Sequence, residues 1–334
     1  MIPMPTPTER PGATPPLRVL VAGATGYIGR RVVAELVERG HRVVSLVRNR
    51  TRDPALSGSE RRRCSLTEPQ SLHRDGIRGE RFDAAVSCIA SRGGGVRDSW
   101  HVEYDANRTL LDAVRDAGAE RFVLLSAICV QRPRLAFQHA KLAFEAELRS
   151  SGLTWSVVRP TAFFKSIAGQ VPRIRAGKPF LMFGPAPGPA CKPISERDCA
   201  AFIADCLDMP DMQDRILPIG GPGPAVTARE RGQMLFELSG RPPRFRHLPL
   251  AMFDVAERVL GSAARLLPGL EDKAEFARIG RYYATESMLA LNPGTGEYDD
   301  AATPEYGSDT LRDFYRRSLE RGLQDQELGE HALF

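Results

Sequence analysis

The stretch LRVLVAGATGYIGRRVVAELVERG, residues 17–40, decides the fold of this chain. It begins with an apolar run typical of a buried strand and ends with the periodicity of an amphipathic helix. Between them stand Gly23, Gly26 and Gly29, three residues apart. In this spacing the first glycine permits a tight turn, the second lets the backbone approach a pyrophosphate, and the third lets the helix pack on the strand. Because free N–H groups at the start of the helix face an anion, the stretch predicts a dinucleotide-binding site.

The composition narrows the class of protein. The chain has 334 residues, of which 42% are hydrophobic and 26% charged, as in ordinary soluble globular proteins. A net charge of +5 is modest for this length and does not indicate nucleic-acid binding. The six cysteines form no C-x-x-C pair and the six histidines no metal-binding motif, so we expect reduced thiols, a cytoplasmic protein and no metal.

Two further features concern membranes and the beginning of the chain. No run reaches the roughly 18 apolar residues that a membrane-spanning helix needs, so no transmembrane segment is expected. Residues 1–16 are rich in proline and are expected to form a disordered leader.

Outward from the glycine motif, strand-like and helix-like patterns alternate. Strands are predicted at residues 17–22, 41–47, 62–65, 83–89, 121–127, 154–158 and 216–219. Helices are predicted at residues 29–40, 67–76, 100–118, 135–150, 195–207, 227–239, 250–267 and 309–321. This alternation predicts an α/β fold, a doubly wound Rossmann-type parallel sheet with a mainly helical C-terminal extension on the substrate side.

The same patterns suggest a division of the chain. Residues 17–220 are expected to form the nucleotide-binding domain and residues 221–334 a helical substrate-side region packed on it, with residues 163–194 contributing. Residues 178–193 are dense in proline and glycine, which predicts an irregular loop rather than a packed element.

The choice of cofactor depends on the end of the second predicted strand. There an NAD enzyme usually carries an acidic residue for the ribose hydroxyls, whereas an arginine accommodates a 2′-phosphate. This chain carries Arg48, Asn49, Arg50 and Arg52, with no acid before Asp53. Since a guanidinium pairs well with phosphate, Arg48 predicts NADPH. The alternative is a solvated basic loop.

Two features near the predicted site have open interpretations. The loop at residues 90–95 contains three glycines at the carboxyl end of a central strand, where such folds hold their ligands. One interpretation is a mobile loop that closes over the ligand, and the other is a surface loop that takes no part in binding. Asn107 lies within a predicted helix, where an asparagine is more often a local helix feature than a catalyst.

Several stretches carry a resemblance to a known family. VAGATGYIG, a strand ending in Ser126, a helix with Lys141, and RPTAFF after the sixth strand resemble an atypical short-chain dehydrogenase/reductase of the NmrA and isoflavone-reductase type over residues 17–220. Residues 124–148, 192–203, 282–289 and 303–315 are similar to the NADPH-dependent 3,8-divinyl (proto)chlorophyllide 8-vinyl reductases. The last two stretches lie outside the general fold, so they discriminate the subfamily better than the glycines do.

The resemblance implies a reaction and a site. The reaction is reduction of the 8-vinyl group of divinyl chlorophyllide or protochlorophyllide to ethyl in (bacterio)chlorophyll synthesis. Lys141 and Ser126 are the implied catalytic residues. The expected cofactor contacts are Gly23, Thr25, Gly26, Tyr27, Ile28, Gly29, Arg48, Ile89, Ala90, Ser91, Lys141, Pro160, Thr161 and Phe163.

One departure from the superfamily affects the chemistry. Its usual Tyr-x-x-x-Lys pair lies one helical turn apart, but here Phe137 occupies the tyrosine position while Lys141 remains. Phenylalanine cannot donate a proton, so carbonyl chemistry is disfavoured and reduction of a carbon–carbon double bond is favoured. Lys141 is expected to hold the nicotinamide ribose; the alternative is a solvated helix lysine.

The proton donor and the substrate contacts stay open at this level. The candidate donors are Lys141, then Ser126 or a water that it holds, then Tyr282 or Tyr283. Phe163, Phe164, Phe180, Met182 and Phe183 are candidates for an apolar wall or for ordinary core positions, and Lys165 or Arg173 for a contact with the substrate's propionate. Peripheral contact with photosynthetic membranes is expected from so apolar a substrate, although the sequence shows no clear anchor. The oligomeric state cannot be predicted.

Two other functions remain open from the sequence. One is a different NADPH-dependent reductase of the atypical family, such as the phenylpropanoid type, against which the C-terminal stretches argue. The other is a non-catalytic NADP-binding redox sensor or assembly protein, which loss of the tyrosine would suit and retention of Lys141 and Ser126 disfavours.

Overall fold

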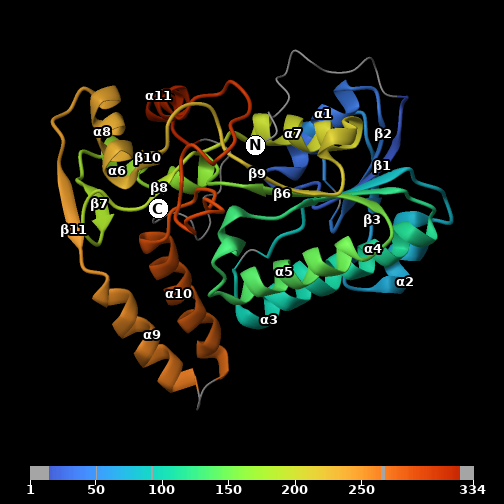
Figure 1. Cartoon of the computed structure of the whole chain (residues 1–334), viewed down its shortest axis with the longest axis horizontal. Coiled ribbons are helices and arrows are strands. Elements are labelled where there is room, and N and C mark those ends of the chain that lie inside the picture. Colours follow the sequence, from blue (N-terminus) through green and yellow to red (C-terminus); the bar gives the residue numbers. More distant parts are fainter. Residues whose placement is uncertain (1–14, 50, 92, 265–267, 324–334) are drawn as a thin grey trace.

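The computed structural model describes residues 15–49, 51–91, 93–264 and 268–323. The chain forms two adjoining lobes, one built on a large sheet and one made mainly of helices (Figure 1). The predicted leader lies outside the described residues except for its last two positions, and so does Arg50. Among the residues that the structure describes, no helix combines the length and the apolar character needed to cross a bilayer.

The first lobe contains a seven-stranded sheet in the order β3-β2-β1-β4-β5-β6-β9, and every neighbouring pair is parallel. The strands are β1 Arg18–Ala22, β2 Arg42–Val47, β3 Glu60–Arg63, β4 Ala84–Ser87, β5 Arg121–Leu125, β6 Thr154–Pro160 and β9 Arg215–Ile219. This order places β1 between β2 and β4, as a doubly wound sheet requires, so the predicted fold class is confirmed. The third strand begins two residues earlier than predicted.

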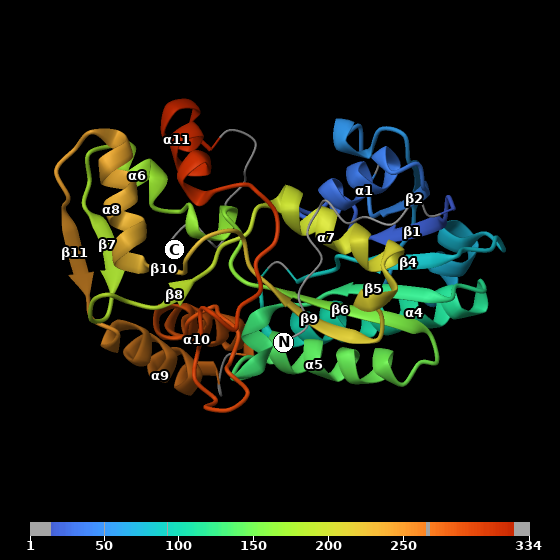
Figure 2. The same cartoon turned by 45° about the horizontal axis from the view of Figure 1, so that its top comes forward.

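Helices cover both faces of this sheet (Figures 1 and 2). On one face α1 and α7 pack through a buried apolar cluster that includes Val32, Leu36 and Phe202. On the other face α4 and α5 pack through a second cluster that includes Leu110 and Phe144. The helices of this lobe are α1 Gly29–Glu38, α2 Pro69–Ser71, α3 Val96–Ser99, α4 Ala106–Asp116, α5 Ala136–Arg149 and α7 Glu196–Asp208, with π-helical turns η2 Leu72–Ile77 and η3 Trp100–Asp105.

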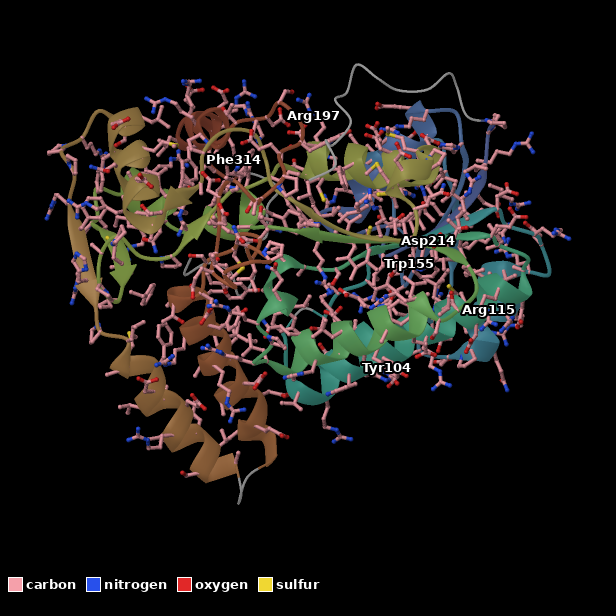
Figure 3. All side chains as sticks on the ribbon, in the orientation of Figure 1. Tyr104, Arg115, Trp155, Arg197, Asp214 and Phe314 are labelled. Carbon is pink, nitrogen blue, oxygen red and sulfur yellow. The ribbon has the colours of Figure 1, made fainter. Side chains whose placement is uncertain are left out.

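The second lobe is formed from residues after β6. Its elements are α6 Val171–Arg175, β7 Phe180–Phe183, β8 Ala190–Cys191, β10 Val226–Thr227, α8 Ala228–Ser239, β11 Phe245–Leu248, α9 Ala251–Ala264, α10 Glu271–Thr285 and α11 Leu311–Arg321. Phe314, labelled in Figure 3, lies against Phe164 with the ring centroids 5.3 Å apart, so α11 packs on the loop that follows β6. The predicted helices 227–239 and 309–321 are found here, and the last three residues of the predicted helix 250–267 lie outside the described residues.

The prediction of an irregular loop over residues 178–193 is wrong. β7 pairs in parallel with β11, and β8 pairs antiparallel with β10. Along β7, Phe180 and Met182 are buried while their neighbours are partly exposed, which is the alternation of a strand with one buried face. Most of the prolines and both glycines of this stretch lie between β7 and β8, so their density concealed the two short strands on either side.

Candidate functional site

The predicted site residues meet at one edge of the sheet. Because all seven strands run in the same direction, their carboxyl ends share an edge, where open α/β sheets hold their ligands. The glycine loop follows β1, Arg48 follows β2, and Ser126 follows β5. The remaining expected contacts lie there too: Ile89, Ala90 and Ser91 after β4, and Pro160, Thr161 and Phe163 at the end of β6.

The glycine loop is shaped by close backbone contacts. Gly23 has a φ of +73°, and a Cβ there would lie 2.3 Å from the carbonyl oxygen of Cys88 at the end of β4. A Cβ on Gly29 would lie 2.1 Å from the carbonyl oxygen of Gly23. The exposed Gly26 closes the turn by donating its N–H to that same oxygen at 2.9 Å. The turn is therefore compact and open on its outer side, as a cradle for a pyrophosphate must be.

The start of α1 favours an anion. No side chain caps the helix, and its first turn carries no acidic residue. Arg30 lies there instead, with its Nε 3.3 Å from the carbonyl oxygen of Gly26 and its Nη2 3.5 Å from that of Thr25. A helix N-terminus without a side-chain cap and a nearby guanidinium both attract a phosphate.

Three residues, Arg30, Arg48 and Asp53, bear on the choice between NADPH and NADH. Arg48 is exposed beyond β2, so the structure keeps both of its interpretations open. The nearest following acid, Asp53, lies 3.9 Å from Arg30 Nη1 and accepts the N–H of Ala55. Asp53 is therefore engaged by the protein itself. Sequence reasoning missed Arg30, although it directly follows the third glycine.

Tyr27 ties the glycine loop to two other elements. Its hydroxyl donates to Glu196 Oε2 at 2.6 Å, at the start of α7. Its ring makes an edge contact with Phe163, with centroids 6.1 Å apart, and Lys165 Nζ lies 5.3 Å from its centroid. Burial and the Glu196 carboxylate raise the pKa of Tyr27, so its hydroxyl stays protonated. Ile28 is buried beneath this loop.

Lys141 is not the solvated helix lysine of the alternative interpretation. Its side chain is 10% exposed, and its Nζ lies 2.7 Å from Glu103 Oε2. The other oxygen of Glu103 accepts the backbone N–H of Ser91 at 2.9 Å. One buried carboxylate therefore holds both the lysine and the loop after β4.

Glu103 was not predicted, but the sequence held a signal for it. It shares one helix face with Asn107, Leu110 and Val114, at spacings of four, three and four residues, and the latter two are buried. An acid on the apolar face of a helix needs a partner. Asn107 supports it, because its Nδ2 donates to the Glu103 carbonyl at 2.9 Å while its Oδ1 accepts from Ser87.

Ser126 and Thr161 are engaged within the protein. Ser126 is buried, with 5% of the residue exposed, and its hydroxyl donates to Glu145 Oε1. Glu145 is also paired with Arg159. The Thr161 hydroxyl donates to the carbonyl of Lys192, and its N–H donates to that of Ile219 at 2.9 Å. Both hydroxyl protons thus have acceptors within the fold.

Helix α10 lies over the loops that follow β4 and β5, as expected of the substrate-side region, although no helix was predicted at these residues. A Cβ on Gly94 would lie 2.6 Å from Ile279, and a Cβ on Gly95 would lie 2.4 Å from the Asp272 carboxylate. The N–H of Val96 donates to Asp272 at 3.2 Å. The glycines of this loop therefore permit close packing on α10.

The candidate apolar wall divides into two groups. Phe164, Phe180 and Met182 are almost fully buried in the core of the second lobe, which matches the alternative that they are ordinary core residues. Phe163 is half-buried at the glycine loop, and Phe183 is half-buried against Phe253, 5.4 Å away. Arg173 donates to the carbonyl of Pro179 at 3.4 Å.

Comparison with known proteins adds three findings. The family described as NAD(P)H-binding matches residues 23–210. Divinyl chlorophyllide a 8-vinyl-reductase, chloroplastic, from Oryza sativa subsp. indica is 52% identical over 331 residues, covering 95% of this chain and 82% of that protein. The protein of the same name from Arabidopsis thaliana is 47% identical over 343 residues, covering 97% and 82%. Among solved structures, the NADPH complex of quinone oxidoreductase QOR2 from Escherichia coli has a TM-score of 0.64 over 89% of this chain and 98% of that chain, at 18% identity, which shows a shared fold.

Proposed function

Since the chain belongs to the divinyl chlorophyllide a 8-vinyl-reductase family, we propose that it reduces the 8-vinyl group of divinyl chlorophyllide to ethyl with NADPH. The observation that carries this proposal is about half identity along 95% of the chain. The similarity thus includes the second lobe, which a nucleotide site alone does not require. The buried Lys141 at the edge of the nucleotide site supports a catalytic role over a sensing one.

The chain's own residues fit NADPH, which supplies the hydride when it is bound. The turn at Gly23–Gly29 cradles the pyrophosphate, and Arg30 and Arg48 meet the 2′-phosphate. Lys141 holds the nicotinamide ribose, and Glu103 holds that lysine in place. Orientation of this kind supplies up to about 7–11 kcal/mol of a barrier for well-placed reactants.

The reaction can be tested directly with the purified protein. Incubation with NADPH and divinyl chlorophyllide should give a pigment heavier by two hydrogens, with one NADPH consumed per product. Absence of that product in a protein that binds NADPH would favour the sensor function. A different reduced substrate with no pigment turnover would favour another reductase of the atypical family.

A pair of lysine variants tests the site. Lys141→Met should remove most of the pigment reduction, since it deletes the charge that holds the ribose. Lys178→Met makes the same change at an exposed position and should leave the rate unchanged. Full activity of Lys141→Met would exclude this lysine from the site.

We further infer that the protein works on the cytoplasmic surface of photosynthetic membranes, which it contacts through α9. Met252, Val255 and Val259 are 46%, 56% and 62% exposed, and their spacing puts them on one side of the helix. With α10, α9 forms a hairpin that projects from the second lobe (Figure 1).

The charges around this apolar side favour an anionic lipid surface. The acids of α9 are neutralised from α10, Asp254 by Arg281 and Glu257 by Arg278. Arg258 on the same helix remains exposed, as does Arg246 on the neighbouring strand β11. Apolar residues flanked by cations are typical of helices that lie on a membrane surface.

Vesicle sedimentation tests this contact. The protein should bind phosphatidylglycerol vesicles more strongly than phosphatidylcholine vesicles, and Val255→Glu should abolish binding. Ile216→Glu, at an exposed apolar position on β9, is the control and should bind normally. Failure of the unmodified protein to bind either vesicle, or self-association through α9 detected by light scattering, would refute the membrane contact.

A further inference from the structure

Tyr282 and Tyr283 are adjacent on α10, and their hydroxyl groups have different partners. Tyr282 is 4% exposed, and its hydroxyl donates to the carbonyl of Cys129 at 2.8 Å and lies 3.1 Å from that of Arg132. Two backbone acceptors thus engage its hydroxyl. Tyr282 fastens α10 to the turn η4 (Ile128–Gln131), which follows β5.

Tyr283 lies on the side of the catalytic lysine. It is half-buried, and its ring meets that of Tyr282 edge-on, with centroids 5.7 Å apart. The neighbouring Cys129 and Glu103, the partner of Lys141, both contribute to raising the pKa of Tyr283, and the Tyr283 hydroxyl interacts with the Cys129 thiol. Burial raises the pKa of the Cys129 thiol, and the nearby charge of Lys141 partly offsets this rise. Tyr283 therefore belongs to the cluster formed by Cys129, Glu103 and Lys141.

The reaction lacks a donor at the position where related enzymes have one. Phe137, one helical turn before Lys141, has no proton to give. Ser126 and Lys141 both donate to carboxylates, those of Glu145 and Glu103, whereas the Tyr283 hydroxyl meets a sulfur atom, which is a weak acceptor. Reduction of a vinyl group nevertheless needs a proton as well as a hydride.

We propose, on the basis of the function proposed above, that Tyr283 is the catalytic residue that protonates the substrate. Hydride addition to one vinyl carbon turns the π pair of the double bond into a carbanion on the other carbon. The Tyr283 O–H bond then breaks, a C–H bond forms at that carbon, and the tyrosine is left as a phenolate. The phenolate recovers a proton from water before the next turnover.

The surroundings of Tyr283 suit this role. Burial first, and then the neighbouring Cys129 and Glu103, raise its pKa well above the ordinary range. The hydroxyl consequently stays protonated across neutral pH, so Tyr283 has a proton to donate in every turnover. A carbanion is a far stronger base than a phenolate, so the transfer remains favourable.

The two tyrosines provide a matched pair of variants in the full chain. Tyr283→Phe keeps the ring and should lower kcat by about 100-fold or more, the usual contribution of a general acid, with the KM for pigment and the NADPH affinity unchanged. Its residual rate should rise with the concentration of an acidic buffer component such as imidazolium, because the buffer replaces the lost donor. Tyr282→Phe should keep kcat within a few-fold, although it loses stability.

Two outcomes would overturn the proposal. Tyr283→Phe with kcat within three-fold of the unmodified protein would exclude it, and so would a 100-fold loss in Cys129→Ala with normal kcat in Tyr283→Phe, which would make the thiol the donor. Failure of the unmodified protein to reduce the pigment would instead refute the proposed function. Thermal unfolding and NADPH binding, measured on each variant, separate misfolding from lost catalysis.

Discussion

The ion pair between Glu103 and Lys141 offers a sharp test of the site, through the variant Glu103→Gln. The two side chains are 3% and 10% exposed, and their charged atoms lie 2.7 Å apart. At that distance an effective dielectric constant of about 20 gives an attraction of about 6 kcal/mol. Part of this attraction offsets the cost of removing both charges from water, so the net loss is smaller.

Removal of one partner leaves a buried charge without its counterion, which typically costs about 3–5 kcal/mol. Glutamine retains an oxygen for the lysine or for the Ser91 N–H, so we expect about 3 kcal/mol, the lower end of that range. Because Ser91 is an expected cofactor contact, NADPH affinity should fall as well. The double variant Glu103→Gln/Lys141→Met should recover part of the stability without recovering activity.

Urea denaturation measures the stability loss, and fluorescence titration measures NADPH binding. The control Glu237→Gln breaks a pair with Arg312 in which both side chains are at least half exposed, and it should cost less than about 1 kcal/mol. A loss below about 1 kcal/mol in Glu103→Gln, with unchanged NADPH affinity, would refute the coupling of the lysine to the loop after β4.

Three further predictions follow from the same structure. Gly23→Ala should abolish NADPH binding and destabilise the fold by more than the roughly 1–2 kcal/mol of a left-handed alanine, because its Cβ would lie 2.3 Å from the Cys88 carbonyl oxygen; normal binding in a titration would contradict this. Arg48→Ala should weaken NADPH far more than NADH, and equal effects on the two titrations would remove its role. Stability should fall as the pH rises from about 9 to about 11, because unfolded thiols ionise near 9.0 while burial raises the pKa of Cys64 to about 11 in the folded chain; Cys64→Ala should reduce this slope in urea titrations.

The sheet was predictable because its signals are local. The hydrophobic pattern of a buried strand or of an amphipathic helix is recognisable within about ten residues, and the glycines between β1 and α1 determine the turn. Strand order then follows from the parallel connections. The short strands β7 and β8 were missed because pairing with distant β11 and β10 stabilises them, and no local pattern records that pairing.

Only the part of the site formed by residues that directly follow the strands could be predicted from the sequence. Residues that follow the strands reach the same edge in any parallel sheet, so their meeting could be inferred. The sequence signals that Glu103 needs a partner, but its contact with Lys141 joins the turn η3 to helix α5, and no local pattern indicates which residues pair between these two elements. Likewise, the sequence named Tyr282 and Tyr283 together, and only their separate partners distinguish them.

The position of Tyr283 has a consequence for how the two lobes depend on each other. In relatives with the Tyr-x-x-x-Lys pair, donor and lysine share one helix of the nucleotide lobe, but here α5 carries Phe137 and the proposed donor comes from α10. Glu275 of α10 accepts the N–H of Ala136 at 2.8 Å, next to Phe137 itself. The chemistry is therefore complete only when α10 is docked on α5, so the second lobe contributes a reacting group as well as substrate contacts. Substitution of phenylalanine for tyrosine on α5 then moves the proton source to another helix without removing it from the site.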